Sequence, residues 1–158
     1  MANTQSMCTS FMGELMTATH NFGTAPTRGT SAADTFKAAL YLATATVDAS
    51  TTVFSVTDEV SGSGYTTGGI TVTMANPPTA TNASATAGVA FFTPSASLVY
   101  SSVTLTTAFD AVLIYNSSQS NKAVSVHTFG SQTISAGTFT LTMPADTTST
   151  ALLRLATT

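Results

Sequence analysis

Residues 111–129 read AVLIYNSSQSNKAVSVHTF, and this stretch decides the fold class. Ala111–Tyr115 is apolar at every position, which is typical of a central strand covered on both faces. The polar run Asn116–Asn121 is typical of a turn, and the residues around Val124–Phe129 are strand-like again. The stretch therefore predicts strands on both sides of a polar turn.

Similar strand patterns recur on both sides of this stretch. Apolar residues alternate with threonine or other residues in four segments, 36–42, 70–74, 103–106 and 139–143, and Val89–Phe92 is a further apolar run. This period of two is typical of half-buried strands. Clusters of turn-forming residues predict turns at 61–64, 68–69, 76–78, 116–121 and 135–137, and a long surface loop over 75–88. We expect eight or nine short strands in a mainly β fold, an antiparallel β-sandwich or jelly roll.

The N-terminal segment differs from the rest of the chain. Met7, Phe11, Leu15 and Met16 recur at helical spacing, which predicts an amphipathic α-helix over residues 5–20, followed by a loop over 21–33. We expect one structural domain, with a helix and arm over 1–33 and the β-sandwich over 34–158. The apolar stripe should pack on the sheet, while residues 1–5 reach outward to a partner.

The composition excludes several classes of function. The chain has 34 threonines but only seven acidic and four basic residues. Four bases cannot neutralise many phosphates, which argues against binding to nucleic acid or to an anionic membrane. Cys8 is the only cysteine, so no intrachain disulfide is possible. The N-terminus lacks a basic start, and no apolar run approaches the length of a membrane helix, so we expect folding in a cytosol.

The candidate sites for chemistry are weak. Asp58 and Glu59 precede a glycine-rich run at 62–69, but the ligand spacing of a calcium loop and the lysine of a phosphate loop are both missing. We interpret this run as a tight connection between strands. His127 lies in a strand-like segment and is expected to face the surface, and no nucleophile elbow is present. The sequence therefore predicts no enzyme, no metal and no cofactor.

Three stretches, residues 3–22, 34–69 and 111–144, resemble a family of small virion proteins of tailed bacteriophages. The most specific parts are DTFKAALY at 34–41, EVSGSGYTTGG at 59–69 and LIYNSSQSN at 113–121. The resemblance implies a structural component of the virion, and no catalytic residue is carried over from it. Residues 75–102 depart from the family pattern, because the tryptophan-containing strand expected there is missing.

These observations lead to one functional hypothesis. We expect a capsid decoration (cement) protein on the outside of a phage head, assembled in the host cytoplasm and bound to the major capsid protein. The mean hydropathy of +0.28 with few charges predicts an oligomer, and three-fold sites of a head shell favour a homotrimer. The predicted partner contacts are Met7, Phe11, Leu15, Asp58, Glu59, Tyr65, Asn116, Asn121 and Lys122. The alternatives are a tail or fibre protein, or a carbohydrate-binding module.

Overall fold

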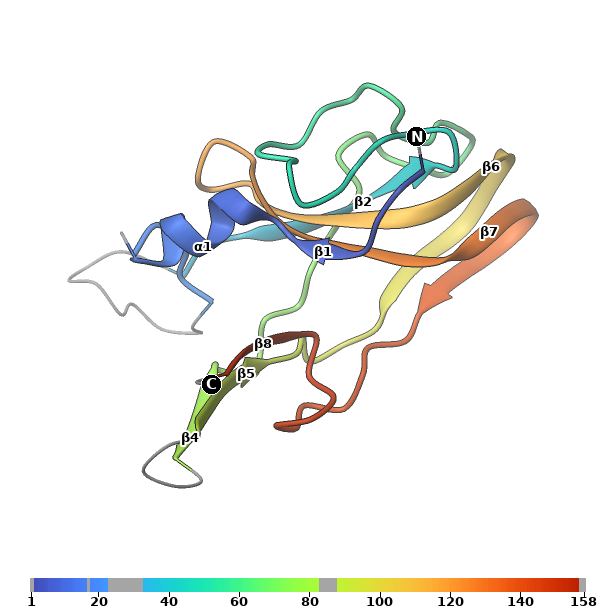
Figure 1. Cartoon of the computed structure of the whole chain (residues 1–158). Coiled ribbons are helices and arrows are strands. Elements are labelled where there is room, and N and C mark those ends of the chain that lie inside the picture. Colours follow the sequence, from blue (N-terminus) through green and yellow to red (C-terminus); the bar gives the residue numbers. More distant parts are fainter. Residues whose placement is uncertain (1, 17, 23–32, 83–87, 157–158) are drawn as a thin grey trace.

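The computed structural model describes residues 2–16, 18–22, 33–82 and 88–156, and it confirms a mainly β fold with antiparallel sheets and one short helix (Figure 1). The helix α1 spans Thr9–Met16. The larger sheet has the order β1-β7-β6-β2-β3, with strands β1 Ser6–Met7, β7 Lys122–Leu141, β6 Leu98–Asn116, β2 Phe36–Leu42 and β3 Ile70–Thr71. The smaller sheet has the order β4-β5-β8, with strands β4 Thr79–Asn82, β5 Gly88–Phe92 and β8 Leu153–Ala156.

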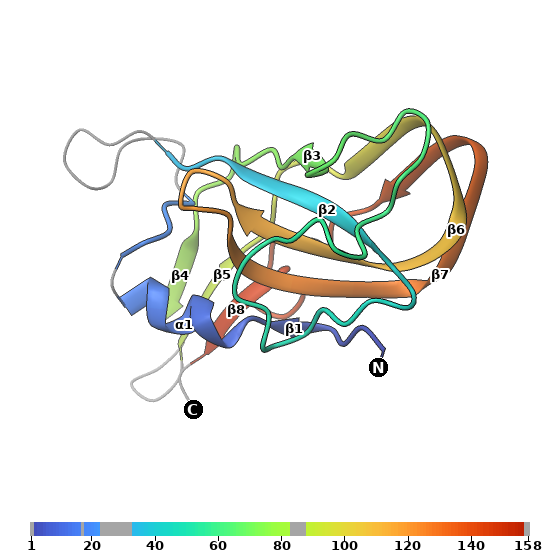
Figure 2. The ribbon, with the colours of Figure 1, turned by 90° about the horizontal axis from the view of Figure 1, so that it is seen from above.

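The fold is organised by one long hairpin rather than by many short strands. β6 and β7 have 19 and 20 residues and pair from Asn116↔Lys122 to Leu98↔Leu141. The pairing register of β6 with β7 shifts between Leu105 and Phe109 and again between Phe109 and Ala111. Such irregularities bend strands. Figures 1 and 2 show both strands curving together at this point. The predicted strands near 103–106 and 111–115 are therefore two parts of one bent strand.

The core lies inside this bend. Ala111–Tyr115 is buried at every position, as predicted for a central strand. The first half of β6 contributes Leu98, Tyr100, Val103 and Leu105 to the same core. Tyr100 reaches across it and donates its hydroxyl proton to the carbonyl of Ala38 on β2, at 2.8 Å. Among the described residues, this one hairpin therefore supplies half of the buried hydrophobic residues.

Several predicted boundaries are wrong. The helix is shorter than residues 5–20, because Ser6 and Met7 pair as β1 with β7. The predicted loop 75–88 contains β4, and the predicted turn 135–137 lies within β7. The strand expected over 70–74 has only the two residues of β3. The predicted loop segment 23–32, residues 83–87 and the Met16 side chain lie outside the described residues.

The N-terminal segment is held against the body of the protein rather than reaching outward. The Asn3 amide donates to the carbonyl of Leu42 at 3.0 Å and also bonds to Asp110. The backbone N–H of Thr4 donates to the carbonyl of Val47. Cys8 is buried, and burial raises the pKa of its thiol to about 11. Residues 3 and 4 therefore lie against the body of the protein instead of extending away from it, while contact of residues 1–5 with a partner stays a prediction.

Candidate functional site

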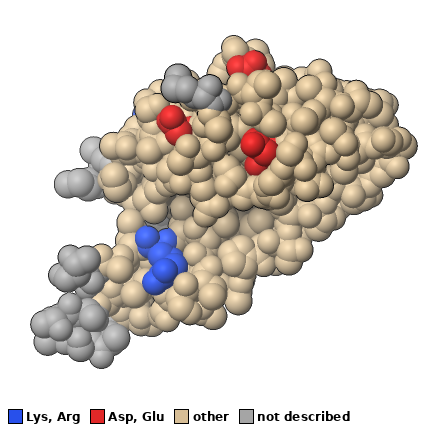
Figure 3. Space-filling view, turned by 45° about the vertical axis from the view of Figure 1, so that its right-hand side comes forward, with Lys and Arg blue, Asp and Glu red and all other residues tan. Residues whose placement is uncertain are grey.

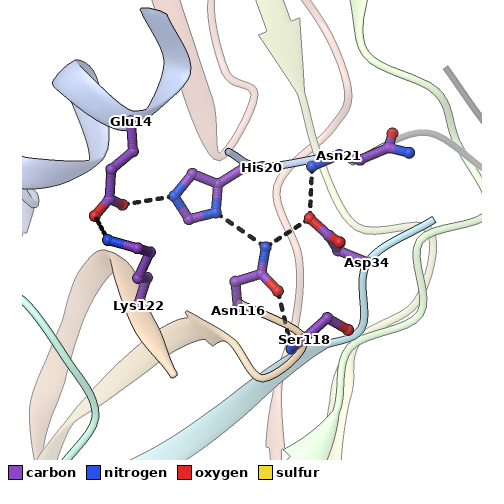
Figure 4. A network of polar contacts seen from close by, with 7 residues as sticks. All are labelled: Glu14, His20, Asn21, Asp34, Asn116, Ser118 and Lys122. Atoms are coloured by element: carbon purple, nitrogen blue, oxygen red, sulfur yellow. Dashed lines mark hydrogen bonds and ion pairs between the residues drawn. The ribbon is translucent and has the colours of Figure 1, made fainter. Parts of the chain in front are cut away.

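A partly buried polar cluster joins the N-terminal segment to the β6–β7 hairpin (Figure 4). The Glu14 carboxylate on α1 accepts from His20 at 2.7 Å and from Lys122 at 2.5 Å. On the other side of the ring, the Asn116 amide lies 3.0 Å from His20 Nδ1 and donates to Asp34 at 2.8 Å. The cluster thus connects α1, the start of β2 and both ends of the hairpin turn.

The end of α1 places His20 in this cluster. Ala18 has a left-handed backbone with a φ of 53°, its N–H bonds to the Leu15 carbonyl, and the N–H of Thr19 bonds to the Glu14 carbonyl. This pair of hydrogen bonds is the Schellman motif that ends many helices. It turns the chain back, so that His20 faces Glu14 from the same helix end. Glycine usually occupies the left-handed position of this motif. Because this chain has alanine there, the sequence gives no sign of how the helix ends.

The electrostatics of the cluster favour a structural role. Burial lowers the pKa of His20 despite the neighbouring Glu14. Partial burial raises the pKa of Glu14, but hydrogen bonds from Lys122 and His20 outweigh it, and the pKa ends below its usual value. The contacts assign Nε2–H as the donor to Glu14 and Nδ1 as the acceptor from Asn116. Both ring nitrogens of His20 are occupied by these contacts, so neither is available to activate a nucleophile.

A second buried carboxylate holds the glycine-rich loop. Glu59 accepts two hydrogen bonds at 2.7 Å, from the Tyr65 hydroxyl and from the N–H of Gly68. The Tyr65 hydroxyl also accepts from the N–H of Leu40 on β2 at 3.0 Å. Burial raises the pKa of Glu59, and these hydrogen bonds offset part of that effect. The loop is therefore held tightly because the buried Glu59 bonds to its backbone at Gly68 and to the Tyr65 side chain.

One serine–histidine pair lies beside a cleft. Ser125 Oγ lies 2.9 Å from His127 Nε2, and both line a cleft of about 310 Å³. His127 is half-buried, which corrects the expectation that it faces the surface. Burial lowers its pKa to about 4, so it is a weak base at neutral pH. The described residues place no carboxylate in hydrogen-bond contact with His127, so the pair lacks the third group of a hydrolase triad.

An apolar groove separates α1 from the smaller sheet. It has a volume of about 100 Å³ and is lined by Met7, Phe11, Leu15, Phe22, Phe92 and Leu153, among others. This volume is below the roughly 300–1,000 Å³ of ordinary ligand pockets. Phe11 itself is buried and makes edge-on ring contacts with His20 and Phe22. The stripe therefore packs on the protein through Phe11, while Met7 and Leu15 are only half-buried.

Comparisons with protein families, curated proteins and solved structures gave no match. Within the described ranges, no group of three or more His, Cys, Asp or Glu could hold a metal ion. No described helix has the length and apolarity to cross a membrane.

The predicted contact residues separate into buried and exposed groups. Phe11, Glu59 and Asn116 are buried and bonded within the fold, so their side chains offer no surface to a partner. Asp58 and Asn121 are exposed, and Tyr65 and Lys122 are half-buried. Because Lys122 is bonded to Glu14 and Tyr65 to Glu59, the exposed part of the prediction reduces to Asp58, Asn121 and their neighbours.

Sequence reasoning missed the polar cluster around His20. Glu14 and His20 occupy one helix end, whereas Asn116 and Lys122 lie about a hundred residues later in the chain. No local spacing links these positions. Asp34 and Asn116 lie in two of the short segments on which the expected resemblance rests, 34–41 and 113–121, but neither segment indicates that the two residues meet. Those segments, like the one containing Glu59 and Tyr65, contain buried polar contacts of the fold.

Proposed function

We propose that this protein is a structural component of a tailed-phage virion that decorates the outside of the head and binds across seams between copies of the major capsid protein. The observation that carries the proposal is an exposed apolar pair beside two polar loops. Val53 and Val56 are 49% and 64% exposed, and the N–H of Phe54 donates to the carbonyl of Asn121 at 2.9 Å. We call Val53, Val56, Asp58, Ser120 and Asn121 the valine face.

The valine face has the composition of a protein contact. Its two valines lie close in the chain to the exposed Asp58, and Lys122 bridges to Val53, so apolar and polar groups occur together as in the core and rim of protein interfaces. Val56 is the most exposed of the large hydrophobic residues described, and Val53 lies three residues before it, so this face offers apolar surface to a partner. Many copies on one shell act together, so a modest affinity per copy suffices to oppose the pressure of packaged DNA.

The buried clusters support a structural role over catalysis. Glu14, Glu59 and His20, which could carry proton transfer, are all bonded within the fold. A carbohydrate-binding module is disfavoured for a related reason. Tyr41, Tyr100 and Tyr115 are buried, and Tyr65 stacks on Tyr100 with ring centroids 6.0 Å apart. The tyrosines thus serve the core instead of an open sugar platform.

The experiment compares binding of variants to phage heads that lack the protein. Val53→Ser/Val56→Ser should fold normally but lose most of its occupancy on the heads, because the valine face supplies the apolar contact. Leu155→Ser is the matched control, since Leu155 is 45% exposed on the smaller sheet. Occupancy is counted by quantitative gel analysis of purified particles, and antibody labelling in electron microscopy locates the protein. Full occupancy of the double variant, or labelling confined to tails, would contradict the proposal.

A further inference from the structure

The second half of β7 has an unpaired outer edge. Residues Gly137–Leu141 pair with β6 on their inner side, with Phe139 opposite Tyr100 and Leu141 opposite Leu98. β1 covers the outer side of β7 only at Ser125 and Val126. Among the described residues, no strand pairs with the outer side beyond that point. Figures 1 and 2 show this part of β7 at the margin of the molecule.

The opposite edge of the same ribbon is covered. The N–H of Thr104 on β6 donates to the carbonyl of Ser63 at 2.8 Å. Gly62 and Gly64 lie so close to β6 that an added Cβ would fall within about 2 Å of the carbonyls of Thr104 and Ser102. The loop therefore lies directly against this side of β6 at residues 102–104 and bonds to it at Thr104. The protein covers one margin of the ribbon closely and leaves the other bare.

The bare edge lacks the usual protection against strand pairing. Exposed edges are normally protected by charged side chains, especially lysine, or by proline. No Asp, Glu, Lys or Arg occurs from Ala123 to Ala145, a stretch that includes the whole edge. In Figure 3 the right-hand part of the face is likewise free of coloured charges. The edge is bounded by Ala136, with a φ of 120°, and by Pro144, which leaves a regular segment between them.

We infer that Gly137–Leu141 pairs antiparallel with the same segment of a second copy, so that the larger sheet continues across a homodimer. The pairing joins two uncharged, threonine-bearing strands, so it brings no like charges together in a chain whose formal net charge is −3. Thr138 and Thr140 are exposed, whereas Phe139 faces the core, so pairing leaves the core intact. β1 pairs antiparallel with the same strand farther along, at Ser125 and Val126, so strand addition to β7 already occurs within the chain outside residues 137–141.

The contact is two-fold, because antiparallel pairing of identical segments is self-complementary. This two-fold contact predicts a dimer of the isolated chain. The three-fold sites of a head shell, considered alone, favour a trimer instead. The inference does not depend on the virion function, since it concerns the isolated chain. A strand donated by another protein, such as a shell protein, would use the same backbone groups. In that case the isolated chain would be a monomer, which the test detects.

The test introduces charges of one sign at the edge. One variant carries Thr138→Lys and Thr140→Lys, and a second carries Thr138→Glu and Thr140→Glu. In either homodimer, like charges face each other across the new strand pair, which should raise the dimer Kd at least about tenfold. In an equimolar mixture, opposite charges meet whatever the register, so dimers should return. Ser101→Lys is the matched control, because Ser101 is exposed on β6, one strand in from the edge.

Sedimentation analysis of the purified full chain reads out the assembly, and amide hydrogen exchange follows residues 137–141. We expect a wild-type dimer with slow exchange at the edge, monomers for both charged variants, a dimer for their mixture and a dimer for Ser101→Lys. Far-ultraviolet circular dichroism and melting curves check that each variant is folded. A monomeric wild type, a trimer, a dimer that both charged variants retain, or a mixture that stays monomeric would overturn the inference.

Discussion

The two margins of the β6–β7 ribbon are built in opposite ways. Residues 58–69 cover one margin, where Gly62 and Gly64 press against β6 and Gly69 presses against the Ala38 carbonyl of β2. Along the other margin, β1 covers β7 only as far as Val126. A Cβ added at Gly130 would have nothing within 4 Å. A loop can cover one edge this closely only where glycines leave room for the neighbouring backbone. The other edge can accept a further strand because it carries no charged residues.

The covered margin also depends on a buried acid. Glu59 bonds to Gly68 and to Tyr65, and the Tyr115 hydroxyl donates to the Gly68 carbonyl at 2.8 Å. These contacts fix the loop at two successive glycines with positive φ, Gly68 and Gly69. Each contact is a place where one substitution should damage the covered margin and leave the open one unchanged.

The largest difference in stability is expected between Gly69→Ala at the covered margin and Gly130→Ala at the open margin. Gly69 and Gly130 have similar φ values, 71° and 76°, but an added Cβ at Gly69 would lie 1.7 Å from the Ala38 carbonyl oxygen. Gly69→Ala should therefore destabilise the protein by about 4 kcal/mol or more, and Gly130→Ala by only the roughly 1–2 kcal/mol of the left-handed backbone. Urea unfolding curves measure both. Equal losses would mean that the covered margin yields as easily as the open one.

The next effect concerns pH and His127, which lies where β1 stops covering β7. Its pKa is about 4 in the folded protein against 6.5 as its ordinary value. Between these values the unfolded chain binds more protons, so stability rises with pH and is lost as pH falls from 6.5 toward 4. The loss from this residue should reach up to about 3 kcal/mol. Chemical denaturation at several pH values measures it.

His127→Gln should remove most of that slope. His20, whose pKa is also lowered by burial, leaves a smaller slope of the same sign. Glu59 acts in the opposite direction, because its raised pKa means that ionisation above its usual range costs stability. A slope unchanged by His127→Gln would show that another group titrates in this window.

A smaller effect is expected at Glu59 itself. Glu59→Ala removes the acceptor for Tyr65 and Gly68, and a buried group left without its partner costs about 1–3 kcal/mol. Glu59→Gln keeps an acceptor oxygen and removes a charge that burial disfavours, so it should change stability by less than about 1 kcal/mol. Thermal melts at neutral pH distinguish the two variants. A large loss for Glu59→Gln would mean that the ionised carboxylate holds the loop.

The smallest effect is expected at the open margin. Thr138→Lys lies on an exposed face away from any buried contact, so the stability of the folded monomer should change by no more than about 0.5 kcal/mol. Urea unfolding at low protein concentration, below any dimerisation, measures this value. Ser101→Lys on β6 serves as the comparison. A loss above 1 kcal/mol would indicate that Thr138 makes a contact within the chain.

The sequence predicts the fold class because the strand signals are local. Ala111–Tyr115 is buried as its unbroken apolar run indicates, and the turn before Lys122 lies where polar residues cluster. The bend in β6 could not be predicted, since it depends on register shifts against β7 that no periodicity reports. The polar cluster was missed for the same reason, because His20 and Asn116 meet only through tertiary packing.

The bent hairpin also implies an order of events in folding. Its pairs begin at Asn116↔Lys122, where the chain closes a short loop, and end at Leu98↔Leu141, where a much longer loop must close. Short loops close at lower entropic cost, so pairing should start at the turn and extend outward. Gly137–Leu141 would then be among the last segments to find its partner on β6. Until it does, a newly synthesised chain offers both sides of this strand to its neighbours.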